Sequence, residues 1–142
     1  MFNTIEILSQ GLSATRLRVN VLSSNLANAE STRTEDGGPY KRKDVVQMAH
    51  GVQGKFSTTL DRMTLAQPSI AQVVEDQSDP RKVYQPGHPD ADPNGYVAFP
   101  NINVVSTMTD LMSASRLYQA NVSAIETVRK MSQDAQQISA RA

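Results

Sequence analysis

Proline and glycine are confined to the middle of this 142-residue chain, where all seven prolines and six of the seven glycines lie between Gly37 and Pro100. Proline breaks the interior of a helix, and glycine weakens it. The two ends can therefore form long helices, whereas the middle cannot. This distribution predicts an N-terminal coiled-coil helix in residues 1–31, a middle domain of strands and loops in residues 32–102, and a C-terminal coiled-coil helix in residues 103–142.

Apolar residues in the first region recur at alternating steps of three and four, which is the a/d pattern of a coiled coil. The pattern continues for nearly four heptads and has one polar member, Thr15. Its apolar members are Ile5, Leu8, Leu12, Val19, Leu22, Leu26 and Ala29. Such a seam occupies about two residues in seven, which favours a partner helix over a broad face on a globular core.

The last region repeats the pattern in two runs, separated by a step of three where a step of four was due. The first run contains Met108, Leu111, Ser115, Tyr118, Val122 and Ile125, and the second contains Val128, Met131, Ala135 and Ile138. Either Asn103 or Ser106 can cap the start of this helix.

Isolated helices with such narrow seams are marginally stable in water. We therefore expect the two helices to pair with each other, with other chains, or both. The predicted contacts lie within one subunit or between neighbours. They join Leu8, Leu12, Val19, Leu22 and Leu26 to Tyr118, Val122, Ile125 and Met131.

Four segments of the middle region have the alternation or the composition of strands. They are Tyr40–Met48, Ser69–Glu75, Lys82–Tyr84 and Gly95–Phe99. Turn dipeptides such as Pro86-Gly87 and Asn94-Gly95 separate the later segments. The predicted fold class is therefore mainly α, with a small β-rich middle between two long helices.

The composition argues against several classes of protein. Lysine and arginine number 14, as do aspartate and glutamate, so the formal net charge is zero. This balance argues against a nucleic-acid-binding protein and against attraction to an anionic membrane. The absence of cysteine excludes disulfides and thiolate metal sites. No apolar stretch is long enough to cross a bilayer, and the first residues lack the pattern of a cleavable secretory signal.

One segment has the residue types of a metal site. His88, Asp90 and Asp92 can supply one nitrogen and two carboxylates. The same residues are typical of a solvated turn, and no further ligand nearby completes a shell. We therefore expect a structural loop at a subunit contact, without metal or cofactor.

The sequence offers little other catalytic chemistry. Neither His50 nor His88 lies in a recognisable catalytic motif. The segment Gly51–Gly54 lacks the flanking pattern of a phosphate-binding loop. Acidic neighbours dilute the basic residues Lys41–Lys43 and Arg33, which favours a solvated or interface surface. We expect no catalytic residue, no enzymatic activity and no small-molecule substrate.

Several motifs resemble a known family. The run Asn25, Leu26, Ala27 and Asn28 is similar to the N-terminal signature of flagellar rod, hook and hook-associated proteins, where it ends the first helix. Tyr84–Val97 resembles the proximal rod members of that family and contains His88, Pro89, Asp90, Asp92, Gly95 and Tyr96. Further similar segments are Thr32–Lys43, Pro100–Val104 and Ser113–Asn121, the last of which contains Tyr118, Gln119, Ala120 and Asn121. The resemblance covers nearly the whole chain and departs at Gln136, where an apolar residue is expected.

The resemblance implies a structural subunit of the bacterial flagellar basal-body rod, which lies in the periplasm and joins the motor to the hook. It implies export through the flagellar type III apparatus without a cleaved signal, and assembly with other rod proteins and with copies of the same chain. In this family the terminal helices form a coiled-coil layer around the export channel, and the tube transmits torque. Asn25 and Asn28 are then expected to support the bend after the first helix. Capping by asparagine in the left-handed conformation is a compatible interpretation.

Two other functions remain open from the sequence. One is a cytoplasmic coiled-coil adaptor, which predicts a stable helical dimer in solution. The other is a small metal-dependent enzyme that uses His88, Asp90 and Asp92. The rod hypothesis predicts instead a poorly helical monomer whose ends are cut quickly by protease, and it involves neither nucleic acid nor direct insertion into a membrane.

Overall fold

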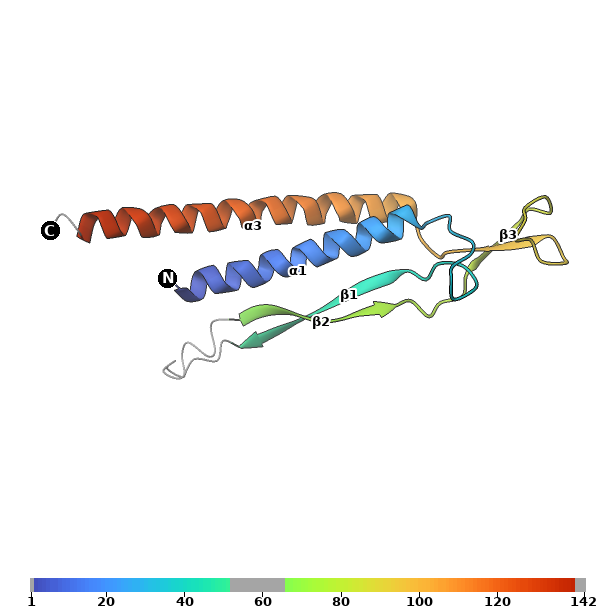
Figure 1. Cartoon of the computed structure of the whole chain (residues 1–142), viewed down its shortest axis with the longest axis horizontal. Coiled ribbons are helices and arrows are strands. Elements are labelled where there is room, and N and C mark those ends of the chain that lie inside the picture. The colour runs from blue at the N-terminus through green and yellow to red at the C-terminus, as the bar shows by residue number, and fades with distance from the viewer. Residues whose placement is uncertain (1, 52–65, 140–142) are drawn as a thin grey trace.

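Two long antiparallel helices form the body of the molecule. The computed structural model describes residues 2–51 and 66–139 (Figure 1). Helix α1 (Phe2–Ala27) and helix α3 (Val104–Ser139) lie side by side, and the two ends of the chain lie at the same end of the pair (Figure 1). The predicted fold class, two long helices around a small β-rich middle, is confirmed.

The middle of the chain forms two antiparallel hairpins. Strand β1 (Lys43–Gly51) pairs with β2 (Ala66–Glu75), with an irregular register beside Val46. Strand β3 (Arg81–Tyr84) pairs with β4 (Tyr96–Phe99). All four predicted strands are present, although β1 begins three residues later than expected and β2 begins three residues earlier. In the predicted glycine loop, Gly51 ends β1, and residues 52–54 lie outside the described residues.

Helix α1 lies between two neighbours, whereas α3 packs on one. The α1 helix contacts α3 on one side and the β1–β2 hairpin on the other (Figure 1). The side chains of Ala14 and Asn25 are buried although neither belongs to the predicted seam. The expectation of a seam of about two residues in seven is therefore wrong for α1, because the hairpin covers a second stripe of this helix.

The stripe of α3 that faces α1 has a continuous register. Eight of the buried and half-buried side chains of α3 follow uninterrupted steps of four and three: Thr107, Leu111, Ala114, Tyr118, Asn121, Ile125, Val128 and Ser132. The predicted seam members Ser115 and Val122 are half-buried beside this stripe. The predicted break after Ile125 is not needed. Met108, which the prediction placed in the seam, is 49 % exposed, and its neighbour Thr107 is buried instead. The prediction favoured apolar residues, whereas closely packed helices also accept small and polar ones.

The helix ends are fixed by asparagines. Asn103 caps α3, because its Oδ1 accepts the Ser106 backbone N–H at 3.1 Å. At the end of α1, Asn28 Nδ2 donates to the Ser24 carbonyl at 2.9 Å. No non-glycine residue in the described ranges has a positive φ, so the left-handed capping interpretation of these asparagines is wrong. No helix in the described part of the chain is long and apolar enough to span a membrane.

Candidate functional site: the helix pair and its junction

The predicted interface residues divide into a covered group and an exposed group. Leu22 is buried in the single chain. The half-buried members are Ile5, Leu8, Leu12, Val19, Leu26, Leu111, Tyr118, Val122 and Ile125. The exposed members are Met108, Met131 at 63 % and Ile138 at 70 %. The structure therefore brings the first two groups into or beside the helix pair and leaves the third on its surface.

An apolar strip lies on the outer side of α3. Val105, Met108 and Met112 are exposed and are spaced by three and four residues, so they share one face of the helix. Leu117 is exposed on another face. Single exposed apolar residues are normal on a protein surface, but a contiguous strip indicates a contact surface.

The two helices differ in length. Helix α3 has 36 residues and α1 has 26, and the C-terminal end of α3 projects past the start of α1 (Figure 1). We define the overhang as residues 133–138, in which every side chain is exposed. It includes Ala135 and Ile138 of the predicted seam. The apolar pattern of α3 therefore continues beyond the part of the helix that α1 covers.

The charged side chains of the helices lack ion-pair partners within the residues that the structure describes. On α1 these are Glu6, Arg16 and Arg18, and on α3 they are Asp110, Arg116, Glu126, Arg129, Lys130 and Asp134. The ion pairs of the described ranges lie in the middle of the chain instead. The helix surfaces thus have apolar and charged groups that no described neighbour covers.

We use the term junction for the region where the end of α1 meets the segment 31–43 and the β3–β4 turn. Its centre is Asn25, which is 1 % exposed. The Asn25 amide donates to the Lys43 carbonyl at 2.7 Å and accepts the Lys43 N–H at 2.9 Å. Its oxygen also accepts the Tyr40 hydroxyl at 3.1 Å. Asn25 therefore bonds the start of β1 to the last turns of α1 as a neighbouring strand would.

Asn28 shapes the turn that follows α1. Besides its bond to Ser24, its Oδ1 accepts the Ser31 hydroxyl at 3.1 Å. The Ser31 N–H donates to the Asn28 carbonyl, also at 3.1 Å. Both asparagines of the motif thus bond to backbone at the bend, although Asn25 reaches a distant segment and Asn28 stays local.

The β3–β4 turn is attached to the junction through Asp90. Its Oδ2 accepts the Thr32 hydroxyl at 2.8 Å, and its Oδ1 lies 3.9 Å from Arg33 Nη1. The Asp90 backbone N–H donates to His88 Nδ1 at 3.1 Å. The Asp92 Oδ1 accepts the backbone N–H groups of Asn94 and Tyr96 at 2.8 and 2.9 Å. These contacts are those of a hydrogen-bonded loop.

The three candidate metal ligands therefore have protein partners. Across residues 2–51 and 66–139, no three side chains of histidine, aspartate or glutamate come together in a geometry that could hold a metal ion. Pro89, which lies between His88 and Asp90, is exposed in this loop.

Gly95 closes the same turn at a position that requires glycine. Its φ is +82°, and a Cβ there would lie 2.8 Å from Tyr84 Cε2. The Tyr84 ring meets the Tyr96 ring edge to face, with centroids 5.4 Å apart. Both rings are exposed, at the end of the molecule that β3 and β4 form (Figure 1).

Two neighbouring basic residues of the junction, Arg42 and Lys43, lie near carboxylates. Arg42 Nη2 lies 2.6 Å from Asp44 Oδ2, and Arg42 Nε lies 3.7 Å from Asp76 Oδ2. Lys43 Nζ lies 3.7 Å from Glu75 Oε1. The pKa of Asp76 lies below its ordinary value, because the Ser78 backbone N–H and hydroxyl donate to its carboxylate and Arg42 adds a positive charge.

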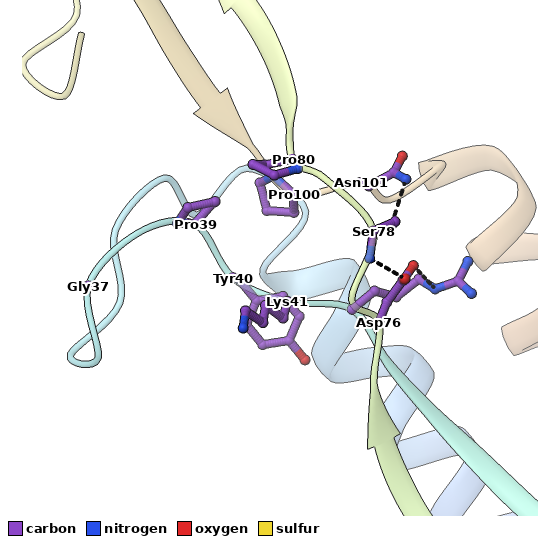
Figure 2. Close-up of a pocket in the computed structure, with 10 residues that line it drawn as sticks. Gly37, Pro39, Tyr40, Lys41, Asp76, Ser78, Pro80, Pro100 and Asn101 are labelled. Atoms are coloured by element: carbon purple, nitrogen blue, oxygen red, sulfur yellow. Dashed lines mark hydrogen bonds and ion pairs between the residues drawn. The ribbon is translucent and has the colours of Figure 1, made fainter. Parts of the chain in front are cut away.

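A small pocket of about 130 Å³ lies beside these ion pairs (Figure 2). Pro39, Pro80 and Pro100 line one part of it, and Asp76 and Ser78 line another (Figure 2). Asn101 Nδ2 donates to Ser78 Oγ at 3.1 Å across its edge. These prolines come from three separate segments of the chain, which meet at this pocket.

Among the remaining motif residues, Asn121 faces α1, where its amide donates to Thr15 Oγ1 at 3.3 Å. Ala27 is the last residue of α1, and Gln119 and Ala120 are exposed on α3. A search for apolar periodicity did not identify the buried Thr107 and Ala114. A search that also accepted small and polar residues at the seam positions would have found the uninterrupted heptad that contains them.

Two family models match the chain. The model described as "Flagella basal body rod protein" matches residues 5–33, and the model described as "Flagellar basal body rod FlgEFG protein C-terminal" matches residues 94–138. These ranges contain most of α1 and α3, together with the asparagine motif and the end of the β3–β4 turn.

Curated relatives match over almost the full length. The chain is 41 % identical over 131 residues to the flagellar basal-body rod protein FlgC of Salmonella typhimurium, with 92 % of each chain covered. It is 38 % identical over 141 residues to FlgC of Borreliella burgdorferi and 35 % identical over 140 residues to FlgC of Bacillus subtilis, again with 92 % of each chain covered. The chain therefore belongs to the FlgC family of flagellar basal-body rod proteins, and it is a structural subunit of the rod.

Proposed function

We propose that the chain assembles into the rod through the outer surfaces of α1 and α3, next to other rod proteins and further copies of itself. One observation carries this proposal: α1 covers only one stripe of α3, and Met108, Met112, Met131 and Ile138 of α3 stay exposed. Burial of an apolar side chain of this size contributes about 1.5–3 kcal/mol. Contacts repeated at every subunit of a tube would therefore supply a large total free energy of assembly.

The division into a helix pair and a junction fits a tube that surrounds the export channel and transmits torque. Helices with partly uncovered seams can pack into a continuous inner layer. The hydrogen-bonded junction then holds the hairpins at a defined angle to that layer. In this proposal Asn25 and Asn28 preserve that angle, since their amides hold the bend after α1.

We also propose that the chain has no enzymatic role and needs no cofactor. The side chains most suited to chemistry, His88, Asp90 and Asp92, all take part in hydrogen bonds within their own loop or to Thr32. Calorimetric titration of the purified chain with Zn²⁺ and Mn²⁺ tests this proposal. Tight stoichiometric binding would contradict it and revive the metal-dependent alternative.

We further propose that the chain reaches a periplasmic rod through the flagellar type III export apparatus and keeps its N-terminal helix. Helix α1 supplies the buried Ala14, Thr15, Leu22 and Asn25, so its removal would expose the side of α3 that it covers. Mass spectrometry of the chain from purified basal bodies should find the N-terminal segment intact. A mature chain that begins within α1 would contradict the proposal.

The main experiment is electron microscopy of cells from which the gene has been deleted, with hooks and filaments counted. We expect no hooks in the deletion strain and normal numbers after re-expression of the full chain. Met131→Asp should restore few hooks, because it places a charge in the proposed contact surface. Met131→Leu, which keeps an apolar side chain of similar volume at the same position, is the matched control and should restore hooks.

Two outcomes contradict this proposal at different levels. Normal hooks in the deletion strain would contradict the requirement for this chain in the rod. Normal hooks with Met131→Asp would leave the rod role intact and contradict assembly through this face of α3. In that case the outer strip at Val105 and Met112 becomes the next surface to change.

A further inference from the structure

A polar contact lies within the mostly apolar seam of the helix pair. Thr15 on α1 is 5 % exposed, and its hydroxyl donates to the Gly11 carbonyl at 2.7 Å. The half-buried Asn121 on α3 donates its amide to the same hydroxyl oxygen at 3.3 Å. The hydroxyl therefore satisfies its own helix and the opposite helix at once.

The apolar residues alone do not fix how far α1 is shifted along α3. Leu8 precedes Thr15 by one heptad, and Val128 follows Asn121 by one heptad. Because the helices are antiparallel, Leu8 lies at the level of Val128 just as Thr15 lies at the level of Asn121. A slide of α1 by one heptad toward the overhang, about 10 Å, would pair Leu8 with Ala135. Thr15 would then meet Val128. Apolar or small partners are thus available at both positions.

Along the part of the seam that both registers share, the same slide would leave one polar group unpaired. It would bring Leu22 opposite Asn121, and the Asn121 amide would face an aliphatic side chain instead of the Thr15 hydroxyl. A polar group covered without a hydrogen-bond partner is costly, whereas Leu8 and Thr15 would still face apolar or small residues. A single polar residue in a helix seam is known to select register in this way.

We propose that Thr15 and Asn121 form a register lock, which holds α1 in place along α3 and prevents it from sliding onto the overhang. The role of this lock in assembly rests on the proposed function. Because the lock keeps α1 off the overhang, the overhang stays available for a neighbouring subunit. The register itself is set by contacts within one chain, and it can be measured without any assembly under conditions in which circular dichroism shows both helices formed.

The test measures the distance between two spin labels by pulsed electron paramagnetic resonance. The chain has no cysteine, so Ser9→Cys on α1 and Thr109→Cys on α3 give two unique labelling sites, both exposed. These sites lie toward opposite ends of the helix pair, so a slide of one heptad lengthens their separation by close to 10 Å. The labelled chain also carries Asn25→Ala, which removes the amide bridge between α1 and β1 and so weakens one other contact that holds α1 in place.

Three versions of this labelled chain are compared. With Thr15 and Asn121 intact, one short distance is expected. With Thr15→Val and Asn121→Leu together, a second and longer distance should appear, its population raised about tenfold, because the slid register no longer leaves an amide unpaired. Circular dichroism should show unchanged helix content, since apolar replacement of both partners preserves packing.

The third version exchanges the two residues, with Thr15→Asn and Asn121→Thr, and should restore the single short distance. An unchanged single distance in the apolar variant would overturn the lock and assign the register to the junction and the loops. A longer distance already present with Thr15 and Asn121 intact would overturn it as well. Failure of the proposed assembly would appear only in the count of hooks and would leave these distances unaffected.

Discussion

In the junction, Asn25 and three basic side chains have partners within the chain, whereas the charged side chains of the two helices have no ion-pair partner among the described residues. Arg33, Arg42 and Lys43 each lie near a carboxylate, and the buried amide of Asn25 makes three hydrogen bonds. On α3, Met131 and Ile138 are exposed, and no described residue pairs with the helix charges.

This difference separates the region whose polar contacts are made within one chain from the region that has surface left for a neighbour. Hydrogen bonds and ion pairs of the junction have fixed partners, so its geometry should be the same in a free chain and in the rod. The helices instead have uncovered surface that a neighbour can bury. The predictions below test this contrast, from the largest expected effect to the smallest.

The largest contrast lies between two apolar residues of the helices. Leu22→Ala should lower the free energy of unfolding by about 2–5 kcal/mol, because it leaves a cavity between α1 and its neighbours. Met131→Ala, at an exposed position, should change it by no more than about 0.5 kcal/mol. Urea denaturation followed by circular dichroism measures both. Equal losses would mean that the covered and exposed groups do not differ as described.

Asn25→Ala should be the most damaging change in the junction. It leaves the part-buried N–H and carbonyl of Lys43 without the Asn25 amide, which should cost about 2–3 kcal/mol. Asn28→Ala removes a local pair of bonds and should cost only about 1 kcal/mol. Amide hydrogen exchange at Lys43 should rise in the first variant and not in the second. Unchanged exchange at Lys43 in Asn25→Ala would remove Asn25 from the centre of the junction.

Gly95→Ala tests whether the backbone conformation of the β3–β4 turn is fixed, as the contacts in the rest of the junction are. A non-glycine residue at a φ of +82° costs about 1–2 kcal/mol, and the added Cβ would displace the Tyr84 ring. Gly87→Ala is the control, because a Cβ added at Gly87 would have open space around it. Comparable stability of the two variants in urea denaturation would refute the requirement for glycine at position 95.

Gly11→Ala should stabilise the helix pair. Glycine inside a helix is less favourable than alanine by about 0.5–1 kcal/mol. The new Cβ would lie 3.8 Å from Asn121 Nδ2 and 3.9 Å from Pro68 Cγ, which is ordinary contact. A higher midpoint of thermal unfolding is expected. A lower midpoint would mean that α1 approaches its neighbours too closely for a methyl group.

The smallest effect concerns acid. Because the pKa of Asp76 is lower in the folded chain, its contribution to stability is complete above the ordinary aspartate pKa of 3.8. That contribution is lost as the pH falls through the lower, folded pKa. Asp76→Asn should therefore flatten the pH dependence of stability below about pH 4. An Asp76→Asn profile that matches the unmodified chain across this range would show that Ser78 and Arg42 do not favour the charged form.

Much of the fold could be predicted because its signals are local. The confinement of proline and glycine placed both helices, and alternation or strand-like composition placed all four strands. Asn103 was readable as a cap because its role depends on residues only three positions away. The asparagine motif was found by resemblance, but its bonds to Lys43 and Tyr40 were not foreseen, since those partners lie 15 to 18 residues away.

The sequence by itself determined that this chain has two long helices, a β-rich middle and no cysteine chemistry, because residue propensity and periodicity act over a few neighbouring positions. Only the tertiary structure decided which stripe of each helix is covered. The hairpin on the second side of α1 buried Ala14 and Asn25, and close helix packing put Thr107 and Ala114 in the seam in place of Met108. Which side chains are buried depends on which surfaces meet in the folded chain. The periodicity of one segment does not specify which other segment packs against it.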